Sequence, residues 1–180
     1  MNASGAWLTW DAGARRFGLK GSQAAAELLQ AGLSVPDQPN TWAPLHAGDP
    51  AQESIVGRLG SMEFFIEEGG DAPGIARLEP LVARGVTGVY PVLREDCALV
   101  LGGPAAGEVL AQVCNVNLPA LDTAARPLVM TLMIGVGVLV LPQATRDGTI
   151  YRIWCDPSLG AYLRQSLEEI ITRISTGSAQ

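Results

Sequence analysis

The longest apolar run in the sequence, LVMTLMIGVGVLVL at residues 128–141, contains one threonine and two glycines. As a helix it would span about 21 Å, whereas a bilayer core needs about 30 Å, so it is too short to cross a membrane. Its β-branched residues favour strands, and its glycines mark a tight turn. We expect strands at 127–134 and 136–142, joined at Gly135 and Gly137. Both strands are apolar on both faces, so their sheet should be covered on each side.

The remaining apolar periodicity predicts an α+β chain of mostly antiparallel sheets with helices packed on them. Strands are expected at 6–11, 15–21, 53–60, 62–70, 86–96, 97–103 and 149–155. Helices are expected at 22–32, 73–84, 104–113 and 157–174, the last one capped by Asp156 and opened by Pro157. Helices 104–113 and 157–174 can cover one face of the sheet that contains residues 128–141. The other face needs the first half of the chain or a neighbouring subunit.

The connections carry recognisable turn signals. A turn is expected at Ala12-Gly13, and Asp147-Gly148 is a hairpin signal. Strand 86–96 is expected to form a hairpin with strand 97–103 through Glu95-Asp96. The loop that contains Pro36, Pro39, Pro44 and Pro50 is too rich in proline for regular structure.

The two halves of the sequence resemble each other. FGLKGSQAAAELLQ at 17–30 aligns with LVLGGPAAGEVLAQ at 99–112, at an offset of 82 residues. Both segments predict a strand, a glycine turn and a helix. We therefore expect a duplicated β-β-α-β-β-α unit, forming one domain over 1–180 with halves at about 1–85 and 86–175.

Composition narrows the possible functions. The net charge of -6 and the pI near 4.7 argue against a nucleic-acid surface, which needs clustered lysine and arginine. The N-terminus lacks a basic region followed by an apolar run, so no secretory signal is expected. Three cysteines, an odd number without short spacing, fit thiols in a reducing cytoplasm.

The segment LVLGGPAAGEVL is the sharpest candidate for a ligand site, because glycines before a helix can bind phosphate. Asp122 lies about where a ribose-binding acid would follow. However, the G-x-G-x-x-G spacing from Gly102 requires a glycine at position 104, where this chain has proline. The equivalent site in the first half keeps only Gly21. We therefore favour a structural turn at Gly102–Gly107.

Other reactive side chains are sparse. His46 is the only histidine, and with Asp49 and Glu53 it could form a weak metal cluster or a general base, although a solvated loop histidine is the simpler interpretation. Zinc would require three distant segments to bring Cys97, Cys114 and Cys155 together. The other carboxylates are interpreted as solvated charges; they are Glu63, Glu67, Glu68, Glu168 and Glu169. No catalytic, cofactor-binding or metal-ligating residue is assigned.

Tryptophan is concentrated near the N-terminus. Trp7 and Trp10 fall on opposite faces of the first strand, so one of them should lie at the surface or under a cover. Contact with a partner is one explanation, and coverage by loop 36–50 is the other. Trp42 and Trp154 complete the set.

The order of segments resembles the gamma subunit of heterotetrameric sarcosine oxidase over nearly the whole chain. The segments are FGLKGSQAAAELLQAGLSVPDQPNTW, VGRLGSMEFFIEE, REDCALVLGGPAAGEVLAQVCNVNL, PLVMTLM and YRIWCDPSLGAYLRQSLEEI. The individual signatures, such as Arg58-Leu59-Gly60 followed by Glu63, are degenerate, so the resemblance rests on the order and spacing of the segments. The resemblance implies a duplicated domain related to the folate-binding domain of aminomethyltransferases. It also implies alpha-, beta- and delta-type partner subunits that hold FAD, FMN, NAD, zinc and tetrahydrofolate.

The expected function is therefore a non-catalytic accessory subunit of a cytoplasmic, flavin-dependent sarcosine or N-methyl amino acid oxidase, without a nucleic-acid or membrane partner. A stand-alone tetrahydrofolate-binding module is the alternative, with Glu63 or Asp96 as the carboxylate that would hold the pterin. A nucleotide-binding enzyme using Gly102–Gly107 is a weaker third hypothesis.

Overall fold

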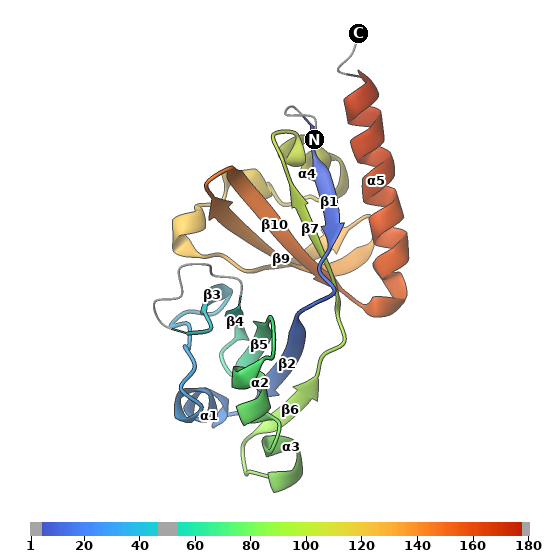
Figure 1. Cartoon of the computed structure of the whole chain (residues 1–180). Helices are drawn as coiled ribbons and strands as arrows, with labels where there is room; N and C mark the ends of the chain where they lie inside the picture. Colours follow the sequence, from blue (N-terminus) through green and yellow to red (C-terminus); the bar gives the residue numbers. More distant parts are fainter. Residues whose placement is uncertain (1–4, 47–53, 178–180) are drawn as a thin grey trace. The chain divides into compact units, whose positions relative to one another are not determined.

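The computed structural model describes residues 5–46 and 54–177 (Figure 1). The chain divides into two compact units, one formed by Gly13–Glu95 and the other by Met1–Ala12 together with Asp96–Gln180. Each unit holds one five-stranded antiparallel sheet. The α+β class and the antiparallel sheets are as predicted.

The unit of residues 13–95 has the strand order β3-β4-β5-β2-β6. Three short helices supply part of the core on one face of this sheet, where Leu28, Ile75 and Leu78 pack with Phe17 and Phe64. The strands are β2 (Arg15–Lys20), β3 (Thr41–Pro44), β4 (Ile55–Gly60), β5 (Glu63–Glu68) and β6 (Tyr90–Leu93), and the helices are α1 (Ala24–Gln30), α2 (Pro73–Leu78) and α3 (Leu81–Arg84).

The other unit has the strand order β1-β7-β10-β9-β8. The apolar sides of its two α-helices share one core with the sheet. Asp156 caps the short 3₁₀ helix that leads into α5, and hydrogen bonds from Ser158 hold the pKa of Asp156 below its ordinary value. The strands are β1 (Trp7–Trp10), β7 (Cys97–Gly102), β8 (Val129–Met133), β9 (Val136–Thr145) and β10 (Gly148–Cys155), and the helices are α4 (Ala106–Val113), α5 (Gly160–Gly177), η1 (Leu118–Ala120), η2 (Thr123–Ala125) and η3 (Pro157–Leu159).

The predicted internal repeat is present, and the two repeats exchange their first strands. When the strand order of the first sheet is read from its β6 edge, each strand has an equivalent in the second sheet. The two orders are β6-β2-β5-β4-β3 and β1-β7-β10-β9-β8. The starts of β2 and β7, and of α1 and α4, keep the predicted offset of 82 residues. However, β1 precedes β2 in the chain and pairs with β7, whereas β6 precedes β7 and pairs with β2. Each sheet therefore takes one edge strand from the opposite side of the repeat boundary.

The equivalent glycines Gly21 and Gly103 make this exchange sterically possible. Both have positive φ, +114° and +95°, a region that favours glycine. A Cβ at Gly21 would overlap the carbonyl oxygen of Gly88, and a Cβ at Gly103 would overlap that of Gly5. Gly88 and Gly5 lie just before the exchanged strands β6 and β1. The glycine turn therefore serves as the close-approach point for the incoming edge strand.

The predicted hairpin between 86–96 and 97–103 is wrong, because β6 and β7 belong to different sheets. Residues 94–96 connect the units, as does the segment around the predicted turn at Ala12-Gly13. For the same reason the structural boundary lies at Glu95 and Asp96 instead of near residues 85 and 86.

Two further predictions need correction. The proline-rich loop contains the short strand β3, which tolerates Pro44 because β3 lies at a sheet edge. The helix predicted at 73–84 consists of α2 and α3, interrupted around Pro80, whose ring cannot continue an α-helix.

The run 128–141 forms the antiparallel pair β8–β9, as predicted. Ile134 and Gly135 are the two residues of the tight turn, with φ of 50° and 79°. One face of the pair belongs to the core shared with α4 and α5. On the opposite face Leu141 is buried, whereas Met130 and Leu132 are 58% and 61% exposed. Coverage on both sides, as predicted from the sequence, therefore holds for part of β9 but not for β8. No helix among residues 5–46 and 54–177 is long and apolar enough to span a membrane.

Replacing Gly103 with alanine should lower the free energy of unfolding by at least about 2 kcal/mol, because the Cβ is disfavoured at this φ and overlaps Gly5. Gly137→Ala is the matched control, since nothing lies within 4 Å of a Cβ there and its φ is not in the positive range. Urea unfolding followed by circular dichroism measures both. Equal stability of the two variants would contradict the close-approach role.

Candidate functional site

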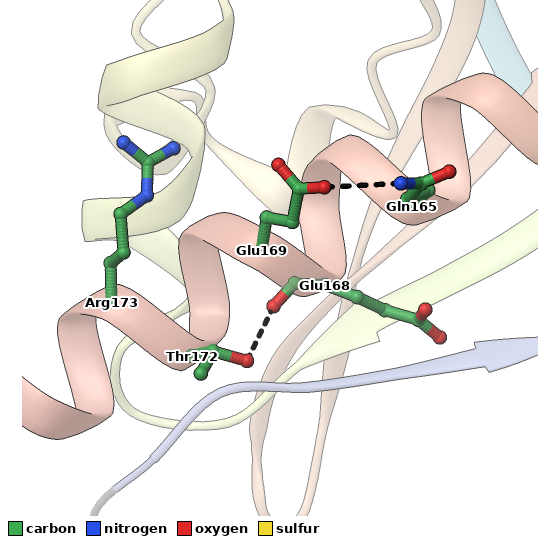
Figure 2. A pocket seen from close by; sticks show the side chains of 5 residues that line it. All are labelled: Gln165, Glu168, Glu169, Thr172 and Arg173. Carbon is green, nitrogen blue, oxygen red and sulfur yellow. Dashed lines mark hydrogen bonds between the residues drawn. The ribbon is translucent and has the colours of Figure 1, made fainter.

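A surface recess of about 390 Å³ lies along α5 (Figure 2). All five of its lining side chains come from this one helix: Gln165, Glu168, Glu169, Thr172 and Arg173. Gln165 donates to Glu169 at 3.2 Å, and the Thr172 hydroxyl donates to the Glu168 carbonyl at 2.8 Å. These are contacts within a helix face, four residues apart. Among the described residues, no groups from separate elements converge on this surface, whereas a catalytic site is typically built from several elements.

A second recess, about 210 Å³, lies between α1 and the pair α2–α3. Arg77 and Arg84 line it opposite Glu27, and its floor includes the buried Leu78 and Leu81. Among the described residues, the lining of this recess holds charge of both signs, with Glu27 as its carboxylate and no serine, cysteine or histidine.

Glu67 and Glu68 are buried, which corrects their interpretation as solvated charges. Glu67 is 0% exposed and accepts a hydrogen bond from Arg16 Nε at 2.5 Å. Glu68 is 3% exposed and accepts hydrogen bonds from the backbone N–H groups of Gly74 and Ile75, at 3.0 and 2.8 Å. Because the N-cap residue of α2 makes no side-chain hydrogen bond, Glu68 satisfies the first N–H groups of that helix.

His46 lies beside this cap. Its Nε2 is 3.6 Å from Glu68 Oε1. Asp49 and Glu53, its proposed co-ligands, lie outside the described residues. Within the described part of the chain, no three histidine, cysteine or acidic side chains gather closely enough to bind a metal. His46 is therefore placed next to a carboxylate that already has a structural role.

The two carboxylates considered for a pterin are in different surroundings. Glu63 forms ion pairs with Lys20 at 2.9 Å and with Arg94 at 3.7 Å, at the surface of its unit. Asp96 belongs to the other unit. Neither residue lines either of the two cavities described above.

Arg58 is an organising residue whose role the sequence did not reveal. Its guanidinium donates to the carbonyls of Pro36, Asp37, Gly60 and Ser61 at 2.8–3.2 Å. It also lies over the ring of Phe64, at 5.6 Å from the centroid. These contacts tie the proline-rich loop to the β4–β5 turn. The Arg-Leu-Gly signature of the sequence is therefore a structural motif.

The glycine turn shows no phosphate cradle. The backbone of Gly5 and Ala6 and the ring of Trp7 occupy the space beside Gly103. Asp122 accepts the N–H of Ala124 at 2.9 Å and so caps η2. The structure thus favours the structural interpretation of Gly102–Gly107 over the nucleotide hypothesis.

Both tryptophans of β1 are exposed, Trp7 by 41% and Trp10 by 42%, whereas the sequence predicted that one of them lies at the surface or under a cover. Trp7 packs over Gly102, where a Cβ would overlap its indole ring. Trp10 is covered in part by Arg164 of α5, whose guanidinium carbon is 5.4 Å from the ring centroid. Trp42 and Trp154 are buried.

Comparison with known proteins shows similarity at the level of structure. No protein-family model matches this sequence, and no curated protein matches it. A solved structure, the heterotetrameric sarcosine oxidase from Corynebacterium sp. U-96 in complex with pyrrole 2-carboxylate, contains a similar chain. The TM-score is 0.74 at 22% identity, over 97% of this chain and 88% of that chain.

The glycine cleavage system aminomethyltransferase T from Bartonella henselae is also similar, with a TM-score of 0.68 at 16% identity over 91% of this chain. This chain has their fold. The resemblance drawn from the sequence is therefore confirmed as a likeness of fold. The match covers 45% of the aminomethyltransferase, so this chain spans less than half of that protein.

Replacing Glu68 with glutamine should lower the free energy of unfolding by about 1–3 kcal/mol, because the charged acceptor of two buried N–H groups is lost. Glu79→Gln is the matched control. Glu79 pairs with Arg15 at the exposed surface of the same unit, and such pairs contribute about 1 kcal/mol or less. Urea titration of both variants tests the cap, and equal losses would contradict it.

Proposed function

We propose that this chain is a non-catalytic accessory subunit of a heteromeric flavin-dependent sarcosine or N-methyl amino acid oxidase in the cytoplasm. The observation that carries the proposal is the fold match to a chain of heterotetrameric sarcosine oxidase, which covers most of both chains. The two chains are therefore similar in extent as well as in fold. In this role the chain stabilises a larger flavoprotein subunit and takes part in one-carbon metabolism through the complex.

The polar groups of the chain support an accessory role. Glu67, Glu68 and Arg58, which are charged residues of the first unit, make structural contacts within that unit. In our proposal, FAD, FMN, NAD, zinc and tetrahydrofolate are bound by the alpha-, beta- and delta-type subunits. This chain then supplies surface and stability to the assembly.

Strand β8 is the surface best suited to such a partner. It lies at a sheet edge and exposes Met130 and Leu132 on one face. Its sequence, VMTLM, contains no charged residue and no proline, the features that commonly protect an edge strand from pairing. A partner that buries these two side chains would remove apolar surface from water at an unprotected edge.

Affinity purification of the tagged chain from its native host tests the accessory role. We expect it to recover a larger subunit with the absorbance of a bound flavin and turnover of an N-methyl amino acid. Recovery of the chain without any flavoprotein, or full turnover by this chain alone, would contradict the proposal. Leu132→Asp should reduce the recovered flavoprotein at least about tenfold, the effect of losing about 1.4 kcal/mol at the interface. Tyr162→Asp, at an exposed apolar position on α5, is the control.

Tetrahydrofolate binding by this chain is the second candidate, favoured by the fold match to an aminomethyltransferase over 91% of the chain. Calorimetric titration of the purified chain with tetrahydrofolate tests it. If a carboxylate holds the ligand, the titration should show a binding heat. Glu63→Gln or Asp96→Asn should then weaken the affinity for tetrahydrofolate about tenfold or more. No heat at high micromolar ligand would remove this candidate and leave the accessory role standing.

A further inference from the structure

Two of the three cysteines face each other across a pair of strands. Cys97 is the first residue of β7, Cys155 is the last residue of β10, and the register of the antiparallel pair places them directly opposite. Directly opposed residues in such a pair have Cα atoms about 4.5–5.5 Å apart. A disulfide spans Cα separations of about 4.4–6.8 Å, so the register places the two cysteines within reach of a disulfide.

The surroundings hold the two sulfur atoms near each other. A Cβ at Gly160, the first residue of α5, would overlap the Cys97 sulfur and lie 3.0 Å from the Cys97 Cβ. The absence of a side chain at Gly160 therefore makes room for the Cys97 side chain beside α5. Burial and the neighbouring Cys97, which accepts a hydrogen bond from the Cys155 thiol, raise the pKa of Cys155 to about 12.

The two residues differ in access, as a reactive thiol and its resolving partner should. Cys97 is half-buried, so a small oxidant can reach it, whereas Cys155 is buried. Cys114 is also half-buried, but its described contacts are with Thr131 and the N–H of Val116 and include no second sulfur. Cys114 therefore serves as an internal control, because it is half-buried like Cys97 but has no second sulfur among its described contacts.

We propose that Cys97 and Cys155 form a reversible oxidation site in which peroxide converts the two thiols into a cross-strand disulfide. The Cys97 thiolate attacks one peroxide oxygen, the O–O bond breaks, and Cys97 becomes a sulfenic acid while hydroxide leaves. The Cys155 sulfur then attacks the Cys97 sulfur, forming the S–S bond and breaking the S–O bond. The Cys155 proton passes to the hydroxide that leaves Cys97, and the proton released when Cys97 ionised neutralises the hydroxide from the peroxide. Two thiols and one hydrogen peroxide thus give one disulfide and two waters.

The bridge would join two junctions of the chain. Cys97 directly follows the segment that enters from the other unit, and Cys155 directly precedes the cap residue of the C-terminal helices. Its formation would therefore tie the entry point of β7 to the start of the α5 region. This inference does not depend on the proposed function, because it concerns thiols within one unit of the chain.

Treatment of the folded, full-length chain with a small excess of hydrogen peroxide tests the site. We expect loss of two of the three titratable thiols, a mass decrease of about 2 Da, and a peptide linking Cys97 to Cys155 in a non-reducing digest, all reversed by dithiothreitol. Three intact thiols, or oxidation of Cys97 without the linked peptide, would overturn the proposal.

Three variants separate the pair from general thiol oxidation. Cys114→Ser should keep the linked peptide at the wild-type yield. Cys97→Ser should abolish the bridge, and Cys155→Ala should stop the reaction at a sulfenic acid on Cys97 that dimedone traps. Circular dichroism establishes that each variant is folded. Where Cys155→Ala does not fold, the linked peptide in Cys114→Ser alone decides the outcome. A disulfide that includes Cys114 in the folded wild-type chain would count against the pair.

Discussion

The fold depends on the close approach of two backbones at a pair of glycines. At Gly21 and Gly103 the turn after a central strand meets the carbonyl of Gly88 or Gly5, just before an exchanged edge strand. A side chain at either turn would push the edge strand away and leave a central strand without its partner. Because each exchanged strand connects directly to a central strand of the other unit, the two sheets are built from interleaved parts of the chain. Each repeat therefore needs the first strand of the other repeat to complete its five-stranded sheet.

This interleaving sets the limit of what the sequence can predict. Apolar periodicity and the offset of 82 residues identify nearly every strand and helix, because those signals are local. The pairing of β6 with β2 is not local. Two short apolar segments separated by Glu95-Asp96 have the sequence pattern of a hairpin. Only the structure shows that the first, β6, joins one sheet and the second, β7, joins the other. Likewise Pro44 argues against a strand until β3 is seen to be an edge.

The carboxylates show a similar limit on predicting the site. In EFFIEE the two final glutamates look like a solvated strand end, yet Glu68 shares its face with Phe64 and Ile66 in the core of the unit. The alternation alone could have placed Glu68 inside. The alternation could not identify the hydrogen-bond donors of Glu68. They are backbone N–H groups of α2, a helix that begins after a turn with Ala72 at positive φ. Buried charge of this kind is stabilised by hydrogen bonds and serves the fold.

The apolar run 128–141 now separates into parts with different roles. One face of both strands packs in the core with α4 and α5, which requires no partner. The opposite face is buried at Leu141 but open at Met130 and Leu132, so the exposed apolar surface is confined to the edge strand. A single chain in water gains nothing from an edge strand without charge or proline, because such edges invite association. A subunit gains a contact surface from the same feature. In the proposed accessory role, a partner that covers this edge would bury Met130 and Leu132 and remove the unprotected edge from water.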